Sequence, residues 1–387
     1  MTHGERPESP KPAFTVSPSR LLGLRVLSVG ARRLASAFAA GFCQPSLLAV
    51  TIALLLCLGG IGAACLLITE AKLTGERVAW YALDPLDDYA FATGTALALR
   101  AQPPQGPAVA LIGTAAMREA LIPDEEIAAR LTRRAGTDVP VIDFMSGGQS
   151  GIEMAALADS LGPDFEGVVV LGISLSRLAA DSSELAGLVR EPRLAFASAA
   201  GDAEIRAAGF SPPWHSGIYF LDNYKFFVAR ARVLLGRVLG GAVPVHASRT
   251  YLDRAPADAR QWETDTRILQ ARLAHYAERA DGNLAAMKRV IGLFPDRRKV
   301  RIVLLEIPLN PRAVSTVIGP ELVEAHRARL RAFAEREGVE YWDLNPVVLL
   351  GPDDFQDWAH VNRADARERW TAPLLDRLLP LLRVPSR

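Results

Sequence analysis

Cysteine is scarce in this sequence and is confined to its N-terminal part. The three cysteines of the 387-residue chain are Cys43, Cys57 and Cys65, and none follows residue 65. This excludes a domain stapled by disulfides and a cysteine-ligated zinc site from the rest of the chain. It also excludes a catalytic cysteine from the C-terminal body.

An excess of either charge is also lacking. Lysine and arginine number 44, aspartate and glutamate number 43, and the net charge is +1. Because no basic block occurs in the body of the chain, we expect no nucleic-acid partner. Half of the residues are hydrophobic, which excludes wholesale disorder, and the length allows two domains or one large one.

One long apolar run is present. Residues 46–69 contain no charged side chain, and these 24 residues exceed the roughly 20 that a membrane-spanning helix needs. A cleaved signal peptide is one alternative, but the run is too long, starts late and lacks a clear cleavage motif. A buried core helix is the other alternative. The sequence favours a transmembrane helix over both, and no second run is long and apolar enough to cross.

The charges beside this run predict its orientation. Residues 1–45 hold six lysines and arginines against two glutamates. The positive-inside rule then places the N-terminus in the cytoplasm and residues 73–387 outside. The stretch 21–43 mixes leucine, valine and phenylalanine with arginine. It forms either an amphipathic helix on the inner leaflet or a plain juxtamembrane extension.

Strand-like runs alternate with helical patterns in the extracytoplasmic body. This alternation predicts an α/β fold with a doubly wound, mostly parallel sheet, in which sites lie at the C-terminal ends of the strands. The predicted strands are 107–113, 139–144, 166–174, 298–310 and 339–345. The clearest helices are 116–134 (interrupted by Pro123), 151–161, 320–337 and about 363–383.

A long insertion, about 175–297, separates the third and fourth predicted strands. Its central part, 214–241, is aromatic and basic, and apolar residues from Leu221 to Val238 fall on one helical face. Two interpretations are open. The face packs on the domain, or it rests on the membrane or docks a membrane partner.

The six histidines show no helical metal spacing, and we expect neither a metal nor another cofactor. His275 and His326 lie in charged helical contexts and are predicted to be solvated. His360 differs because it lies in a loop between the fifth strand and the last helix, three residues after Asp357. In such a D-x-x-H turn the carboxylate can orient the imidazole and stabilise its cation, as in a hydrolytic triad.

Together, the Gly-ended first strand and the C-terminal D-x-x-H resemble the SGNH/GDSL hydrolase superfamily. The resemblance is greater to its membrane-anchored extracytoplasmic branch, which includes DltD and the alginate acetylation factors. That branch often carries G-[TS]-S-x-x-R-E after the first strand, and this chain matches it at Gly113, Thr114, Arg118 and Glu119. The resemblance spans about 105–387 apart from the insertion.

The chain departs from the family pattern at its most important position. The nucleophilic serine of the family falls on Ala115, whose methyl group cannot attack an acyl carbon. The glycine of the second block falls on Gly147 or Gly148. The asparagine of the third block falls near Ser174, so that oxyanion donor is altered.

Three explanations of Ala115 are open. The natural protein lost its nucleophile and now binds or scaffolds, or the chain is an engineered inactive variant, or a neighbour serves instead. The neighbours are Thr114, which family precedent turns away from His360, and Ser146 and Ser150 after the second strand. Retention of the Asp–His pair favours an inactivated variant or a recent loss.

The resemblance implies an O-acyltransferase or esterase of the bacterial inner membrane. It would transfer an acyl group, most simply acetyl, to or from an extracytoplasmic polysaccharide or glycolipid, beside a membrane-bound O-acyltransferase. A serine at position 115 would be the nucleophile, His360 the base and Asp357 its orienting partner. The alternative is a non-catalytic scaffold or polymer-binding subunit of an envelope complex, and a structural membrane protein with a coincidental D-x-x-H is a third reading.

Overall fold

The structure is a computed structural model, and it describes four segments of the chain, 46–75, 87–181, 183–231 and 255–382. The chain divides into two units, Met1–Ala64 and Cys65–Arg387. The predicted helix at 21–43 lies outside the described residues.

Helix α2 (Leu47–Leu67) matches the apolar run. It has 21 residues, none of them buried, and it is long and apolar enough to cross a membrane. Isoleucine, leucine and valine side chains exposed along a whole helix are costly in water, because apolar surface is stabilised by leaving it. The predicted apolar helix is confirmed, and it is consistent with a single-pass anchor.

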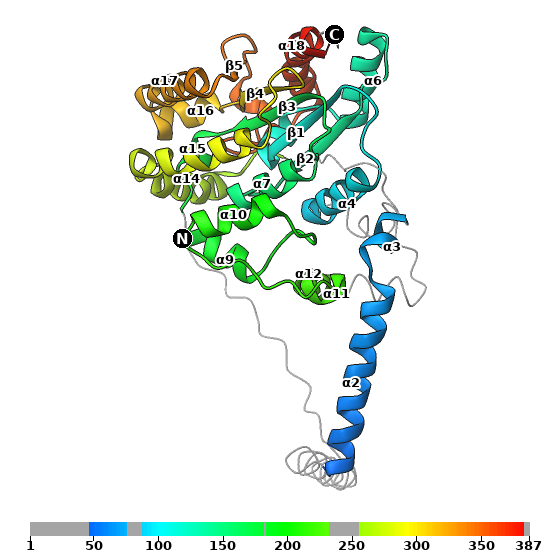
Figure 1. Cartoon of the computed structure of the whole chain (residues 1–387). Helices are drawn as coiled ribbons and strands as arrows, with labels where there is room; N and C mark the ends of the chain where they lie inside the picture. Colours follow the sequence, from blue (N-terminus) through cyan, green and yellow to red (C-terminus); the bar gives the residue numbers. More distant parts are fainter. Residues whose placement is uncertain (1–45, 76–86, 182, 232–254, 383–387) are drawn as a thin grey trace, which may run out of the picture. The chain divides into compact units, whose positions relative to one another are not determined.

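The second unit is built on a sheet of five strands, all parallel, in the spatial order β2-β1-β3-β4-β5 (Figure 1). The α/β class and all five predicted strands are confirmed, with ends that differ by a few residues. The strands are β1 (Ala108–Thr114), β2 (Val141–Ser146), β3 (Gly167–Ile173), β4 (Val300–Glu306) and β5 (Glu340–Asp343).

Helices connect successive strands, and most of them lie in the insertion between β3 and β4. The helices before β3 are α3 (Glu70–Gly75), α4 (Asp88–Ala101), α5 (Ala115–Ala120), α6 (Asp124–Ala135) and α7 (Gly151–Asp159). Those of the insertion are α8 (Leu175–Leu178), α9 (Ser183–Arg190), α10 (Ala199–Ala207), α11 (Tyr219–Asp222), α12 (Tyr224–Ala229), α14 (Ala259–Leu273) and α15 (Tyr276–Gly292). After β4 come α16 (Pro311–Ala313), a π-helical turn (Val314–Ile318), α17 (Pro320–Glu337), a 3₁₀ turn (Pro352–Asp354) and α18 (Ala364–Leu382).

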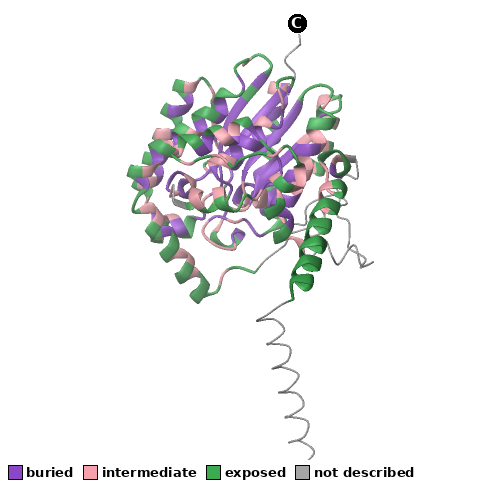
Figure 2. Ribbon diagram, turned by 60° about the horizontal axis from the view of Figure 1, so that its bottom comes forward, coloured by how far each residue is buried: buried purple, intermediate pink, exposed green. Residues whose placement is uncertain are grey.

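Both faces of the sheet are covered. In β1, Val109 and Leu111 join the hydrophobic cluster that α6 and α18 complete. Ala110 and Ile112 join a second cluster on the opposite face, with α4, α7, α15 and α17. Because side chains alternate along a strand and both faces are covered, the strands read as continuous apolar runs. Figure 2 shows the strands buried at the centre of this unit.

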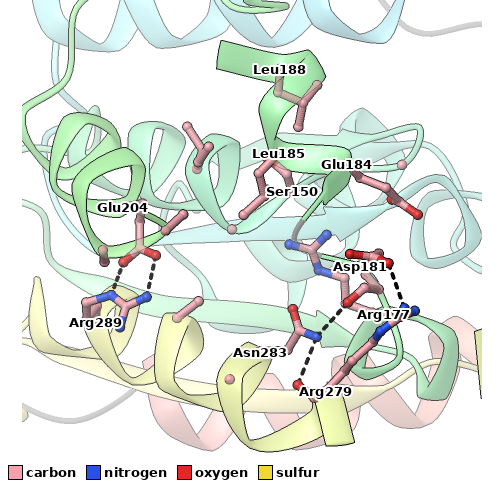
Figure 3. Close-up of a pocket in the computed structure, with 18 of the residues that line it drawn as sticks. Ser150, Arg177, Asp181, Glu184, Leu185, Leu188, Glu204, Arg279, Asn283 and Arg289 are labelled. Carbon is pink, nitrogen blue, oxygen red and sulfur yellow. Dashed lines mark hydrogen bonds and ion pairs between the residues drawn. The ribbon is translucent and has the colours of Figure 1, made fainter. Parts of the chain in front are cut away.

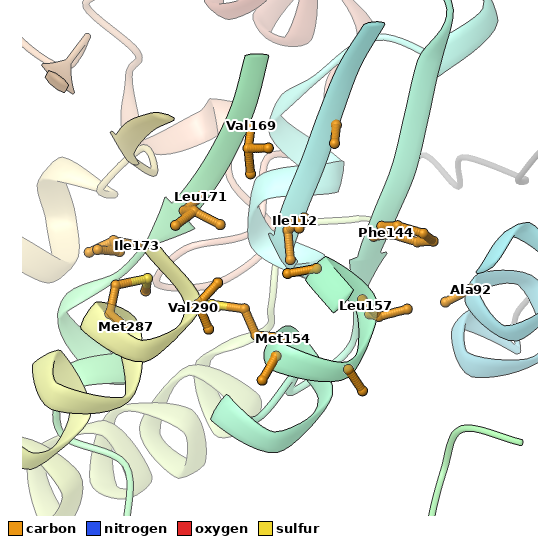
Figure 4. Packing of buried hydrophobic residues seen from close by; sticks show 14 of the residues in the cluster. Ala92, Ile112, Phe144, Met154, Leu157, Val169, Leu171, Ile173, Met287 and Val290 are labelled. Carbon is orange, nitrogen blue, oxygen red and sulfur yellow. The ribbon is translucent and has the colours of Figure 1, made fainter. Parts of the chain in front are cut away.

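Helices α7 and α15 form much of the second cluster. Met154 and Leu157 of α7 and Met287 and Val290 of α15 lie against the strands and are almost fully buried (Figure 4). Burying each such side chain stabilises the fold by about 1.5–3 kcal/mol. The unbranched methionines can fill irregular gaps between helix and sheet. This packing fixes the segments that follow β2 and β3.

One histidine prediction is wrong. His326 is fully buried in α17, and its Nδ1 lies 2.9 Å from the hydroxyl of Tyr276. Burial, together with the nearby positive charges of Arg327 and Arg329, lowers the pKa of His326 to about 4. The charged neighbours in sequence suggested a solvated helix face, but His326 lies on the face that packs inward. His275 is exposed, as predicted.

The aromatic part of the insertion is only partly packed. Asn223 separates α11 from α12, and Phe226 and Phe227 are buried. Trp214 is 84% exposed and Val228 is 63% exposed. Some side chains of this region therefore pack on the domain, and others form an exposed apolar surface. The end of the predicted face, from residue 232 on, lies outside the described residues.

Candidate active site

The predicted Asp–His pair is formed. Asp357 Oδ2 lies 2.7 Å from Nδ1 of His360. Asp357 Oδ1 accepts hydrogen bonds from the backbone N–H groups of Ala359 (2.8 Å) and His360 (3.0 Å). The backbone of the turn therefore holds the Asp357 carboxylate in place through Oδ1, independently of the bond between Oδ2 and the imidazole. The His360 side chain is 28% exposed, and its Nε2 has no hydrogen-bond partner among the described residues, so it can exchange a proton with a bound molecule.

The pair shifts both pKa values in the direction that a general base needs. Burial lowers the pKa of His360, but the hydrogen bond and charge of Asp357 outweigh burial and raise it above the ordinary value. For Asp357, burial raises the pKa, and the bonds from His360 and two backbone amides outweigh burial and lower it. Asp357 is therefore ionised, and it orients His360 and stabilises its cation.

The loop that carries the pair is attached to the end of β4. Asn310, which is 2% exposed, donates from Nδ2 to the backbone oxygen of Asp357 at 2.7 Å. Its Oδ1 accepts from the backbone N–H of Arg312 at 2.9 Å. The bridge between Phe355 and Val361 closes the same loop. Sequence reasoning missed Asn310, although an asparagine directly before a proline at a strand end is a signal for a cap.

The short helix that begins at the predicted nucleophile position lies near this loop. Thr114 ends β1, and Ala115, half-buried, is the first residue of α5. The charges of Glu119 and Arg118, on the same short helix, act on His360. Arg367, near the start of the helix that follows His360, donates to the backbone oxygen of Glu119 at 3.2 Å. Helix α5 and the His360 loop are therefore neighbours at the C-terminal edge of the sheet.

Glycines allow the close packing of β1 and β3 at this edge. A Cβ at Gly113 would lie 2.8 Å from the sulfur of Met117, and one at Gly172 would lie 2.4 Å from it. Real side chains do not approach so closely, so both positions need glycine for Met117 to cover the strand ends. This explains the glycine that ends the first predicted strand in terms of packing.

The role predicted for Gly147 needs correction. Its backbone N–H donates to Asp88 Oδ2 at 2.8 Å, so it is not open to an oxyanion. Asp88 also pairs with Arg118 and thus joins the segments after β1 and β2. Gly148, with φ of 59°, makes no hydrogen bond through its N–H within the described segments. Of the two glycines, only Gly148 therefore has a backbone N–H that is available to a ligand among the described residues. Sequence reasoning missed Asp88, because the ion pair spans 30 residues.

The hydroxyl groups near Ala115 differ in how they are used. Ser174 caps α8, and its Oγ lies 3.1 Å from that of Ser176. Ser150 caps α7 in a capping box with Glu153, and Ser146 is fully buried and accepts from Gln149. The hydroxyl groups of these three serines are therefore engaged in hydrogen bonds to residues close in sequence. Thr114 makes no side-chain capping bond.

The insertion also contributes to the site. Burial raises the pKa of Asp265 in α14, the charge of Asp357 raises it further, and His360 lowers it. The Asp265 carboxylate therefore lies close enough to sense both members of the pair. The Asp265 carboxylate accepts no hydrogen bond in the part of the chain that the structure describes. A third acidic group beside His360 favours its cation.

A second buried polar cluster lies at the ends of β4 and β5. Burial and the charge of Asp343 raise the pKa of Glu306 to about 7. Arg327 pairs with Asp343 at 3.0 Å and lies 3.4 Å from Glu306, which also bonds to the hydroxyl of Tyr341. Since its members satisfy one another, this cluster supports the junction of the two strands.

Comparison with known proteins adds no assignment. The sequence matches no protein-family model and no curated protein. A function for the site therefore has to be inferred from the geometry described above.

Proposed function

We propose that this chain is a membrane-anchored SGNH-like protein of the bacterial cell envelope, with a doubly wound extracytoplasmic domain whose site binds acyl esters of a polysaccharide or glycolipid. The observation that supports this most directly is the 2.7 Å hydrogen bond between Asp357 and His360, near the helix that begins at Ala115. Nε2 of His360 has no partner among the described residues. The site holds an oriented base and lacks a nucleophile. As it stands, the chain is nearly inert and binds rather than turns over its ligand.

A serine at position 115 would complete the mechanism. Its Oγ would attack the acyl carbon while His360 Nε2 accepts the hydroxyl proton and Asp357 stabilises the imidazolium. The N–H of Gly148, which makes no hydrogen bond within the described segments, would be one donor to the oxyanion. His360 would return the proton to the leaving alcohol, which gives an acyl-serine. Water or a sugar hydroxyl would then attack this ester, with His360 again taking the proton, and would release the serine.

The anchor suggests where this chemistry belongs. Helix α2 is long enough to span, and the basic residues of 1–45 favour a cytoplasmic N-terminus and an extracytoplasmic domain at the bacterial inner membrane. An esterified polymer outside that membrane needs acyl groups supplied from within. We therefore propose a membrane-bound O-acyltransferase, or a larger polysaccharide-synthesis complex, as the partner.

A specific observation favours a second function, that of a non-catalytic scaffold. Trp214, Ile218, Tyr224 and Val228 expose apolar surface in the insertion. Exposed apolar patches of this kind mark sites for proteins or membranes. In this alternative the Asp–His pair stabilises its loop, and the protein presents a polymer to an envelope complex.

Restoring the nucleophile separates the two functions. We expect the full-length Ala115→Ser variant to hydrolyse an activated acetyl ester, since a triad nucleophile is worth on the order of 10⁶ in rate. The parent chain should show no turnover above background. Release of the chromogenic alcohol measures both.

The matched control is the double variant Ala115→Ser/His360→Ala, which should lose the gained activity. If folded Ala115→Ser protein shows no turnover, the catalytic reading is wrong and the scaffold remains. If the parent chain already turns over and Thr114→Val abolishes it, the nucleophile is Thr114.

A further inference from the structure

A cavity of about 750 Å³ lies between the end of β2 and the insertion. Its wall begins at Gly148 and Gly151 and continues along α8, α9, α10 and α15 (Figure 3). Its size is that of a small-molecule site. The lining is rich in charged groups, which include Arg177, Arg279 and Arg289 and the carboxylates that face them.

Most of these charges are neutralised in pairs. Arg279 binds Asp181 at 2.6 Å, and Arg289 binds Glu204 at 2.7 Å, both drawn as dashed lines in Figure 3. Arg193, at the rim, pairs with Glu153 at 2.5 Å. These arginines therefore need no ligand to compensate their charge.

Arg177 differs from these arginines. Its guanidinium makes no hydrogen bond or ion pair with any residue that the structure describes, and only its backbone N–H is bonded, to Ser174. Glu153 and Glu184 act on it as charges, but each is already engaged, by Arg193 and by Arg272 (2.9 Å). A Cβ on Gly151 would lie 3.9 Å from Nη2 of Arg177, so the guanidinium extends to the start of α7.

This arrangement is costly without a partner. Arg177 is half-buried in the wall of the cavity, and this burial lowers the pKa of its guanidinium. A partly desolvated cation favours an oppositely charged partner, and arginine keeps its proton, so the charge of Arg177 persists. A planar guanidinium is suited to bind the two oxygens of a carboxylate or phosphate.

We propose that this cavity binds a small hydrophilic molecule that carries a carboxylate or phosphate group, such as an acidic sugar or a sugar phosphate, and that its oxyanion pairs with Arg177. Asn283 and the paired side chains of the wall offer donors and acceptors to hydroxyl groups. Gly148 is shared with the proposed ester site, but neither Asp357 nor His360 lines the cavity, and the proposal does not depend on ester chemistry at that pair.

Calorimetry on the full chain in lipid nanodiscs tests the proposal, with glucuronate, inorganic phosphate and glucose as probes. We expect one or both anions to bind and glucose not to bind. The Arg177→Gln variant should weaken anion binding at least tenfold, and added salt should weaken binding to the parent. Arg177→Lys, which keeps the charge and loses the planar fork, should fall between the two.

The control is Arg298→Gln, which removes the same charge from an exposed arginine that does not line the cavity. Its anion affinity should equal that of the parent. Equal affinity in parent and folded Arg177→Gln overturns the proposal, as does the absence of binding by either anion at millimolar concentration. If Arg177→Gln does not fold, the Arg177→Lys comparison decides the outcome.

Discussion

At the scale of single residues, one hydrogen bond controls the chemistry of the site. The hydrogen bond that His360 Nδ1 donates to Asp357 decides which nitrogen of His360 faces the open side, and it raises the pKa of His360 against the effect of burial. Glu119 adds to this shift from α5, while Arg118 opposes it. The local D-x-x-H spacing allowed this pair to be predicted. The contributions from α5 required the fold, because more than 230 residues separate the two segments.

The raised pKa predicts the pH dependence of a serine-restored enzyme. A base acts in its neutral form, so activity of Ala115→Ser should rise with pH, with a midpoint above the ordinary histidine value of 6.5. Asp357→Asn removes the charge that raises this pKa, so the midpoint should move down. Its rate should fall by about 10²–10⁴, because the tautomer is no longer fixed. Initial rates from pH 5 to 9 measure both effects. A midpoint that Asp357→Asn does not move would contradict the assigned role.

The same shift has a consequence for stability. Because the folded-state pKa of His360 is raised, protonation stabilises the fold. That contribution is fully present below the unfolded value near 6.5 and is lost as pH rises through the folded value. Stability and activity therefore depend on pH in opposite directions at this residue.

At the scale of elements, the sequence predicted what depends on local pattern. Continuous apolar runs located all five strands, and the bounds of α17 match the predicted 320–337. Pro123 separates α5 from α6 as its restricted backbone requires. Strand order, by contrast, is decided by which surfaces pack together. Periodicity does not show that Asp265 of the insertion lies near Asp357, and it does not show that His326 is buried.

Two glycines with positive φ provide a matched test of how the strands meet. Gly167 begins β3 with φ of 129°, and a Cβ there would lie 2.0 Å from the backbone oxygen of Ala108. Gly106 has φ of 108°, but a Cβ there meets nothing within 4 Å. Both alanine variants incur backbone strain of roughly 1–2 kcal/mol, and Gly167→Ala adds a collision worth about 1–3 kcal/mol or more. Chemical denaturation should rank Gly167→Ala as clearly less stable. Equal loss in the two variants would show that β1 and β3 do not approach this closely.

At the scale of the whole molecule, the apolar helix and the charges before it predict the compartment. Helix α2 has no buried residue, so it needs an apolar surrounding that the described residues do not provide. Six basic residues precede it. From this asymmetry the positive-inside rule predicts a cytoplasmic N-terminus and an extracytoplasmic C-terminal unit.

A reporter fused to the C-terminus of the full chain tests that orientation. Alkaline phosphatase, which is active only outside the cytoplasm, should be active in this fusion, and a cytoplasmic reporter at the same position should be inactive. Replacing Arg25, Arg32 and Arg33 with alanine should reduce the correctly oriented fraction, while replacing residues after α2 should change it little. An active cytoplasmic reporter on the parent chain would reverse the proposed topology.

The sequence alone determined the apolar helix, the α/β class, the five strands and the Asp–His turn, because each depends on neighbours within a few residues. It also located the segments after the strands, where the site lies. Only the tertiary structure bonded the Gly147 N–H to Asp88, attached the Asp357 loop to Asn310, and left the Arg177 guanidinium in a charged cavity with no partner among the described residues. These features join residues distant in sequence, and they depend on which charges the packed helices bring together and which they keep apart.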